Sequence, residues 1–173
     1  MAEMTEKDVR IGVEEGFTDK RAEERQRKPM RIMVFNVGEE EEVTEMQQVA
    51  RIMQEFPRTL SGALDTVMRE YSIKNKDLAI DSDIDEKTIA RIRSIIEYKP
   101  KLQTIIQLCI GLRVPAEISL TLIDVSGYKL RFYGIELAYF HIITQKIGCT
   151  LEDCNGYLKA LGYPQLGENY QVA

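Results

Sequence analysis

The sequence has a single histidine, no tryptophan and three cysteines among its 173 residues. One histidine excludes a His-Glu-x-x-His zinc motif, which needs two. Cys149 and Cys154 are five positions apart and do not have the two-residue gap of a zinc knuckle, and Cys109 lies on an apolar stripe. We therefore expect no metal site. An odd number of cysteines also suits reduced thiols better than a disulfide framework.

Sequence motifs of enzymes are missing as well. The chain has no glycine-rich phosphate loop and no Gly-x-Ser-x-Gly turn, and its paired carboxylates have no basic or nucleophilic partner that we can identify. His141 falls on an apolar helical stretch, where a histidine is more often a core or boundary residue than a catalyst. The sequence therefore predicts a protein that is not an enzyme and has no cofactor.

Long apolar runs are also missing. None approaches the roughly 20 residues of a membrane span, and the first seven residues lack the basic-then-apolar layout of a signal peptide. We therefore expect a cytoplasmic protein that makes no membrane contact. The length fits one domain plus extensions, and the apolar share of 44% is ordinary for a globular protein.

Charge is unevenly distributed along the chain, whose net charge is −5. Residues 1–55 carry a net charge of −5, residues 56–115 carry +2, and residues 116–173 carry −2. The positive middle part permits contact with nucleic acid. It also contains the most informative pattern of the sequence.

That pattern is a pair of short helices joined by a tight turn, over residues 75–94. Small and apolar residues lie on one face of the first helix, at Leu78, Ala79 and Ser82. Ile89 and Ile92 lie on one face of the second, and an isoleucine at 84 can fill the angle between the two. This is the packing pattern of a helix-turn-helix, whose second helix enters the major groove of DNA.

The Leu-Ala pair at 78–79, the turn and the run EKTIARI at 86–92 resemble the XRE family, the lambda-repressor/Cro-like transcriptional regulators. The family usually has glycine in the turn where this chain has Asp83. Aspartate tolerates the positive φ of such a turn better than most residues do. The resemblance implies a five-helix DNA-binding domain, a dimer and a palindromic DNA site.

The fold class we predict is all-α: a lambda-repressor-like five-helix domain at 58–128, a charged N-terminal extension at 1–57 and extra helices at 129–173. Thr59 is expected to cap the first helix of the five, Asp85 the third and Thr150 the last helix of the chain. Pro115 is expected to open the fifth helix and Gly127 to end it. The tail after Pro164 is expected to be loose.

The N-terminal extension has three parts. Residues 1–29 are read as a solvated helix or a disordered arm rather than a DNA-binding arm. Residues 30–37 read as a strand, which would pair with a partner chain or belong to a larger upstream domain. Residues 41–56 read as an amphipathic helix that packs on the core or joins a dimer interface, with an apolar stripe at Val43, Met46, Val49, Ala50, Met53 and Phe56.

The resemblance places the DNA-reading side chains at the start of the second helix and on the third helix, at about 85–96. Arginine suits guanine, and glutamate can accept a hydrogen bond from cytosine. The predicted base contacts are Asn75, Glu86, Lys87, Ala90 and Arg91. The predicted phosphate contacts are Lys74, Lys76, Arg93, Lys99 and Lys101.

Three functional hypotheses follow. The first is a sequence-specific transcriptional regulator that binds double-stranded DNA as a homodimer. The second is a non-enzymatic protein-interaction module on a helix-turn-helix scaffold, with a protein partner bound through the N-terminal extension. This hypothesis is favoured by the acidic side chains at positions 81, 83, 85 and 86. The third is the regulatory part of a longer protein.

Overall fold

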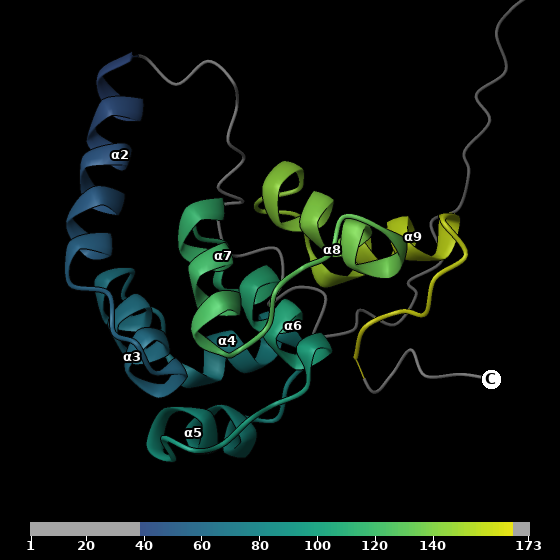
Figure 1. The fold of residues 1–173 in the computed structure, drawn as a ribbon, viewed down its shortest axis with the longest axis horizontal. Helices are drawn as coiled ribbons and strands as arrows, with labels where there is room; N and C mark the ends of the chain where they lie inside the picture. Colours follow the sequence, from purple (N-terminus) through teal and green to yellow (C-terminus); the bar gives the residue numbers. More distant parts are fainter. Residues whose placement is uncertain (1–38, 168–173) are drawn as a thin grey trace, which may run out of the picture. The chain divides into compact units, whose positions relative to one another are not determined.

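The computed structural model describes residues 39–167, and every regular element in that range is a helix (Figure 1). The strand expected at 30–37 lies outside the described residues. The helices are α2 (Glu39–Gln54), α3 (Leu60–Glu70), α4 (Asn75–Ser82), α5 (Glu86–Ser94), α6 (Leu102–Leu112), α7 (Ala116–Val125), α8 (Gly134–Gln145) and α9 (Leu151–Ala160). None of these eight helices combines the length and apolar character that a membrane span requires.

The predicted all-α class is confirmed for the described residues, and helices α3 to α7 occupy the range predicted for the five-helix unit. Thr59 caps α3 as expected, since its Oγ1 accepts a hydrogen bond from the Gly62 N–H at 3.3 Å. Asp85 stands at the N-cap position of α5, but its side chain makes no capping hydrogen bond. Helix α5 ends at Ser94, two residues before the predicted end, because Ile95 is extended.

Helices α4 and α6 pack extensively on each other (Figure 1). Gly111 of α6 lies so close to α4 that a Cβ added there would stand 2.8 Å from the Ser82 Cβ and 3.0 Å from the Ser82 N. Gln107, one turn earlier on α6, donates from Nε2 to the Ser82 carbonyl at 3.0 Å. This bond satisfies one of the carbonyls that every helix C-terminus leaves without an intrahelical partner.

The turn between α4 and α5 has the geometry expected from the sequence. Asp83 is left-handed, with φ 53° and ψ 38°. Ile84 is 8% exposed, and Leu78 and Ile89 are fully buried on either side of it. Helices α4 and α5 therefore form a corner with an apolar interior, and α5 also packs on α3.

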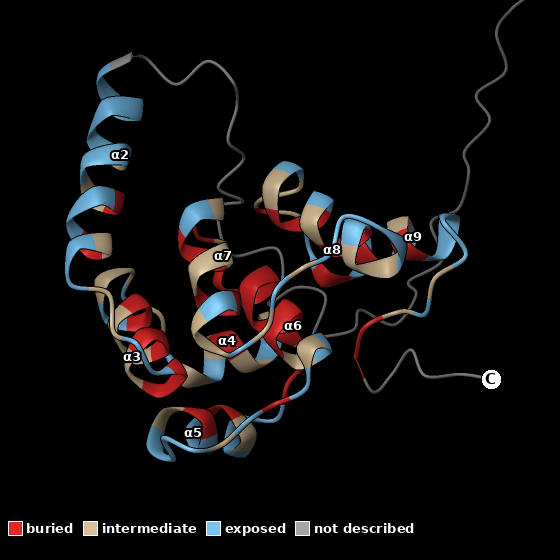
Figure 2. Cartoon of the chain, viewed as in Figure 1, coloured by how far each residue is buried: buried red, intermediate tan, exposed pale blue. Residues whose placement is uncertain are grey.

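Helix α2 occupies 39–54 rather than the predicted 41–56, and it faces the core differently from the prediction. Val49 and Ile52 are buried, at 4% and 5% exposure, whereas Ala50, expected to face inward, is exposed. Buried positions occur only in the C-terminal half of this helix, and Figure 2 shows its N-terminal turns as exposed. The predicted helical period was therefore correct. The predicted set of inward residues was wrong, because Ala50 faces solvent and Ile52 faces the other helices.

The C-terminal helices end in an anchored segment. Helix α8 covers 134–145 and buries Ala138, Tyr139, Ile142 and Ile143. Asn155 of α9 is fully buried; its Nδ2 donates to the Leu166 carbonyl at 2.8 Å and its Oδ1 accepts from the Leu166 N–H at 2.7 Å. Leu166 is 1% exposed. The expectation of a loose tail after Pro164 was wrong as far as Gly167, because a buried amide side chain needs these backbone partners.

We predict that Gly111→Ala lowers the free energy of unfolding by about 1–3 kcal/mol, because the methyl group meets the backbone of α4. Urea denaturation of the full chain measures this loss. Gly156→Ala in α9 is the matched control, since an added Cβ there meets nothing within 4 Å. That control is expected to leave stability unchanged or raise it by up to about 1 kcal/mol. Equal effects of the two substitutions would contradict the close packing of α4 on α6.

A second prediction concerns the capping box of α9. Thr150 Oγ1 lies 2.7 Å from Asp153 Oδ2, the Thr150 N–H donates to the same oxygen, and these bonds lower the pKa of the Asp153 carboxyl. A lowered folded-state pKa stabilises the fold above the ordinary aspartate pKa, and this stability is lost as pH falls through the folded value. Asp153→Asn should therefore cost roughly 0.3–1 kcal/mol at pH 7.

The cost of Asp153→Asn should shrink towards zero as the pH falls below the ordinary aspartate pKa and through the lowered folded-state value, when wild type and variant are melted side by side over a pH series. Asp124→Asn, at an exposed position near the end of α7, serves as the control. A loss from Asp153→Asn that stays constant with pH would show that the carboxylate charge does not contribute.

Candidate nucleic-acid interface

The outer face of α5 carries four of the five predicted base contacts. Glu86, Lys87, Ala90 and Arg91 are all exposed, whereas Ile89 and Ile92 on the opposite face are 0% and 1% exposed. The 3.6-residue period produces this separation, because positions 86, 87, 90 and 91 fall on one side of a helix. Figure 2 shows the two classes alternating along α5.

Arg91 lies beside an aromatic ring from the loop that follows α5. Its Cζ is 5.6 Å from the ring centroid of Tyr98, which is partly buried. A guanidinium over an aromatic face is held by the ring quadrupole and keeps its donors for other partners. Tyr98 is a residue that the sequence reading did not assign to the site.

The loop after α5 is anchored between two exposed lysines. Pro100 is buried, and its carbonyl accepts a hydrogen bond from the Tyr128 Oη–H at 3.0 Å. Lys99 and Lys101 on either side of it are exposed. The two cations therefore extend from a fixed segment of the protein backbone. Cations held in this way suit contacts with phosphates, which orient a protein on a duplex.

Asn75 and Arg93, predicted to touch DNA, contact each other. Arg93 Nη1 donates to Asn75 Oδ1 at 2.6 Å, and Arg93 Nε and Nη2 both donate to Asp65 Oδ1, the first at 3.2 Å. This network joins α3, α4 and α5. Arg93 and Asn75 are partly buried, and the hydrogen bond between them helps to hold α5 against the start of α4. Asp65 was missed because nothing in the local sequence links it to Arg93.

Exposed cations outnumber exposed carboxylates around this corner. Between residues 74 and 101 the exposed cations are Lys74, Lys76, Lys87, Arg91, Lys99 and Lys101, and the exposed carboxylates are Asp85, Glu86 and Glu97. Asp81, one of the acidic residues noted in the sequence, lies 3.7 Å from Arg113 Nη2. The exposed charge here is therefore more positive than the net charge of the chain indicates.

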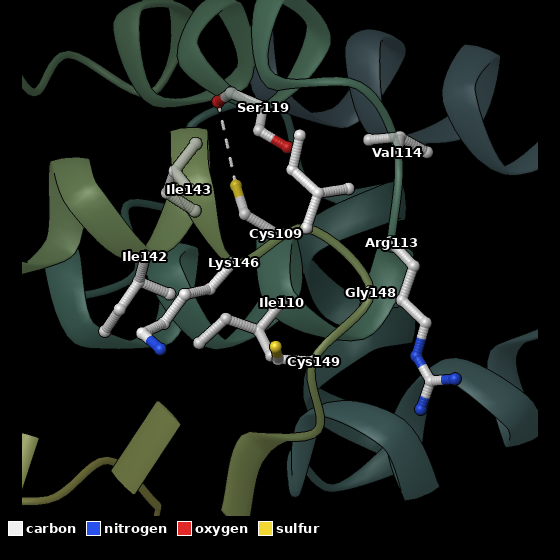
Figure 3. Close-up of a pocket in the computed structure, with 11 residues that line it drawn as sticks. Cys109, Ile110, Arg113, Val114, Ser119, Ile142, Ile143, Lys146, Gly148 and Cys149 are labelled. Atoms are coloured by element: carbon white, nitrogen blue, oxygen red, sulfur yellow. Dashed lines mark hydrogen bonds between the residues drawn. The ribbon is translucent and has the colours of Figure 1, made fainter. Parts of the chain in front are cut away.

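A small cavity lies among α6, α7 and α8, and its lining includes Cys109, Ser119 and Cys149 (Figure 3). It has room for about one water molecule. Cys109 donates from Sγ to the Ser119 carbonyl at 3.6 Å, and burial raises the pKa of its thiol to about 12. Figure 3 shows the Arg113 guanidinium pointing away from this thiol. A thiol protonated at neutral pH is a poor nucleophile, so Cys109 acts as a core residue.

His141 lies at the surface of α8, where its ring stacks on Tyr157 with the centroids 5.3 Å apart. Lys146 Nζ lies 4.8 Å from the centroid of the same tyrosine ring. The expectation that His141 is a core or boundary residue was wrong, because His141 is exposed and only the face of its ring is covered by Tyr157. The three side chains pack the end of α8 against α9.

Neither models of protein families, nor curated proteins, nor solved structures gave a match to this chain. The face of α5 offers two cations, a carboxylate and a methyl group at neighbouring positions. These are the groups that read guanine, cytosine and the thymine methyl in the major groove.

Proposed function

We propose that this chain is a sequence-specific DNA-binding transcriptional regulator that places α5 in the major groove. The observation that carries the proposal is the position of Lys87 and Arg91. Both project from the exposed face of the second helix of a two-helix corner, while the opposite face is buried. A helix of about 10–12 Å diameter fits the roughly 12 Å width of the major groove.

Each of the four predicted base contacts on α5 has a role in this proposal. Arg91 donates to guanine O6 and N7, and Tyr98 limits the directions its guanidinium can take. Lys87 serves a guanine or a phosphate, Glu86 accepts from a cytosine amino group, and Ala90 contacts a thymine methyl. Asn75 keeps its amide nitrogen as a donor to a base, while its Oδ1 accepts from Arg93.

The lysines at 74, 76, 99 and 101 contact phosphates on either side of the groove. Arg93 joins them only if it leaves Asp65, so its first role is to hold α5 against α3 and α4. The carboxylates of Asp85 and Glu86 lower the affinity for any phosphate nearby. Binding by one copy is therefore weak, and two copies on a palindromic site are needed, with half-sites about one helical turn apart.

A second candidate, a protein-interaction module, is favoured by the loop before α8. Phe132 and Tyr133 are 71% and 64% exposed. Arg131 holds the loop, because its Nη2 donates to Glu136 Oε1 at 2.8 Å and its Nη1 donates to Tyr133 Oη at 3.0 Å. An ordered loop that presents two aromatic rings to solvent is typical of a protein-binding surface.

For the DNA-binding proposal we predict that Arg91→Ala costs about 1–3 kcal/mol on the preferred site and relaxes the preference at one base position. Selection from randomised duplexes finds the site, and titration of wild type and variant on it measures the cost. Lys159→Ala removes an exposed cation from α9 and is the matched control. If Arg91→Ala left both the affinity for the site and the base preference unchanged, the placement of α5 in the major groove would be contradicted.

Lys99→Ala should act differently, because a phosphate contact carries no base preference. We expect it to weaken binding to all duplexes about equally and to reduce the slope of log K against log salt by about one unit. Gel shifts with random duplex at low and moderate salt measure both effects. Wild-type chain that binds no duplex at any salt concentration would instead support the protein-interaction candidate.

A further inference from the structure

Helix α2 has two apolar stripes, and the rest of the described chain covers one of them. Val49 and Ile52 form the covered stripe. Val43, Met46, Ala50 and Met53 form a second stripe at spacings of three, four and three residues; its last member, Met53, is half-buried against the core, and the other three are not covered by the described residues. Val43 is 55% exposed, Met46 is 53% exposed and Ala50 is exposed as well, and Figure 2 shows this end of α2 uncovered.

We propose that the second stripe pairs with α2 of a second copy of this chain, and that the two helices run antiparallel. Spacings that alternate between three and four residues place side chains along one seam, as in a coiled coil. With the two-fold axis near residue 48, Met46 of one copy lies opposite Ala50 of the other. A large side chain then meets a small one, and Val43 lies opposite Met53.

The charges at the ends of α2 determine the direction of pairing. Glu40, Glu41 and Glu42 are exposed at its N-terminal end. Arg51, Glu55 and Arg58 are exposed at its C-terminal end or just beyond it, which leaves this end with a net charge of +1, and Arg51 Nη2 donates to Glu70 Oε2 at 2.9 Å. Parallel helices would bring both sets of glutamates together. Antiparallel helices place each set near the arginines of the other copy and also align the helix dipoles favourably.

The length of α2 limits the size of this contact. A helix of 16 residues is about 24 Å long. A contact between two helices of this length is small beside the roughly 1,200 Å² at the lower end of stable interfaces, so we expect a reversible, concentration-dependent dimer. This pairing goes beyond DNA binding and is measured without DNA. Its failure and the failure of the proposed function are therefore distinguishable.

The first experiment is sedimentation equilibrium of the full chain over a range of concentrations from micromolar to a few hundred micromolar. The wild type should approach the mass of two chains, and Met46→Glu should stay at the mass of one over the whole range. Met46 is exposed in the single chain, so the melting temperature of the Met46→Glu variant should equal that of the wild type. Thr44→Glu adds the same charge on another face of α2 and should dimerise as wild type does.

The second experiment tests direction by mild oxidation of cysteine variants, with wild type as the baseline for its three native thiols. An equimolar mixture of M46C and A50C chains should form an interchain disulfide in much higher yield than either variant alone. Strong linkage of M46C to itself would overturn the antiparallel arrangement. A wild type with the mass of one chain throughout, or a dimer that survives Met46→Glu, would overturn pairing through α2.

Discussion

The contact of α6 with α4 is the constraint on which the exposed corner depends. A glycine at 111 lets the two helices approach until only a hydrogen atom fits between them, and Gln107 then reaches the last carbonyl of α4. A buried carbonyl without a partner would cost about 1–3 kcal/mol, so this hydrogen bond also fixes where α4 stops. The turn at Asp83 begins directly after that point, and the direction of α5 follows from it.

A second set of contacts holds α5 from its other side. Arg93 links it to Asp65 of α3 and to the first residue of α4, while Ile89 and Ile92 fill the corner beneath it. The buried and exposed faces of α5 are therefore fixed by independent interactions at both ends of α4. Rigid placement matters for base reading, because a side chain that reads a base edge has to arrive within hydrogen-bonding distance in a set direction.

Much of this organisation could be predicted from the sequence, because it follows from local rules. The spacing of apolar residues predicts the helices. The chemistry of the side chains predicts the caps at Thr59 and Thr150 and the left-handed turn at Asp83. What could not be predicted depends on partners distant in the chain. The choice between Ala50 and Ile52 as the inward residue depends on the position of α7, and the partner of Arg93 lies 28 residues earlier. The sequence likewise predicted that Asn75 and Arg93 contact DNA, and it could not show that these two side chains contact each other.

The amide of Asn155 has a practical consequence for handling this protein. Its two hydrogen bonds close a ring of chain from α9 to Leu166, so the residues just beyond the last helix are part of the folded unit. An expression boundary drawn at the end of α9 would strip a fully buried side chain of both its partners and uncover the site that Leu166 fills. An expression boundary, affinity tag or fusion partner placed on the C-terminal side therefore has to leave the residues up to Gly167 in place.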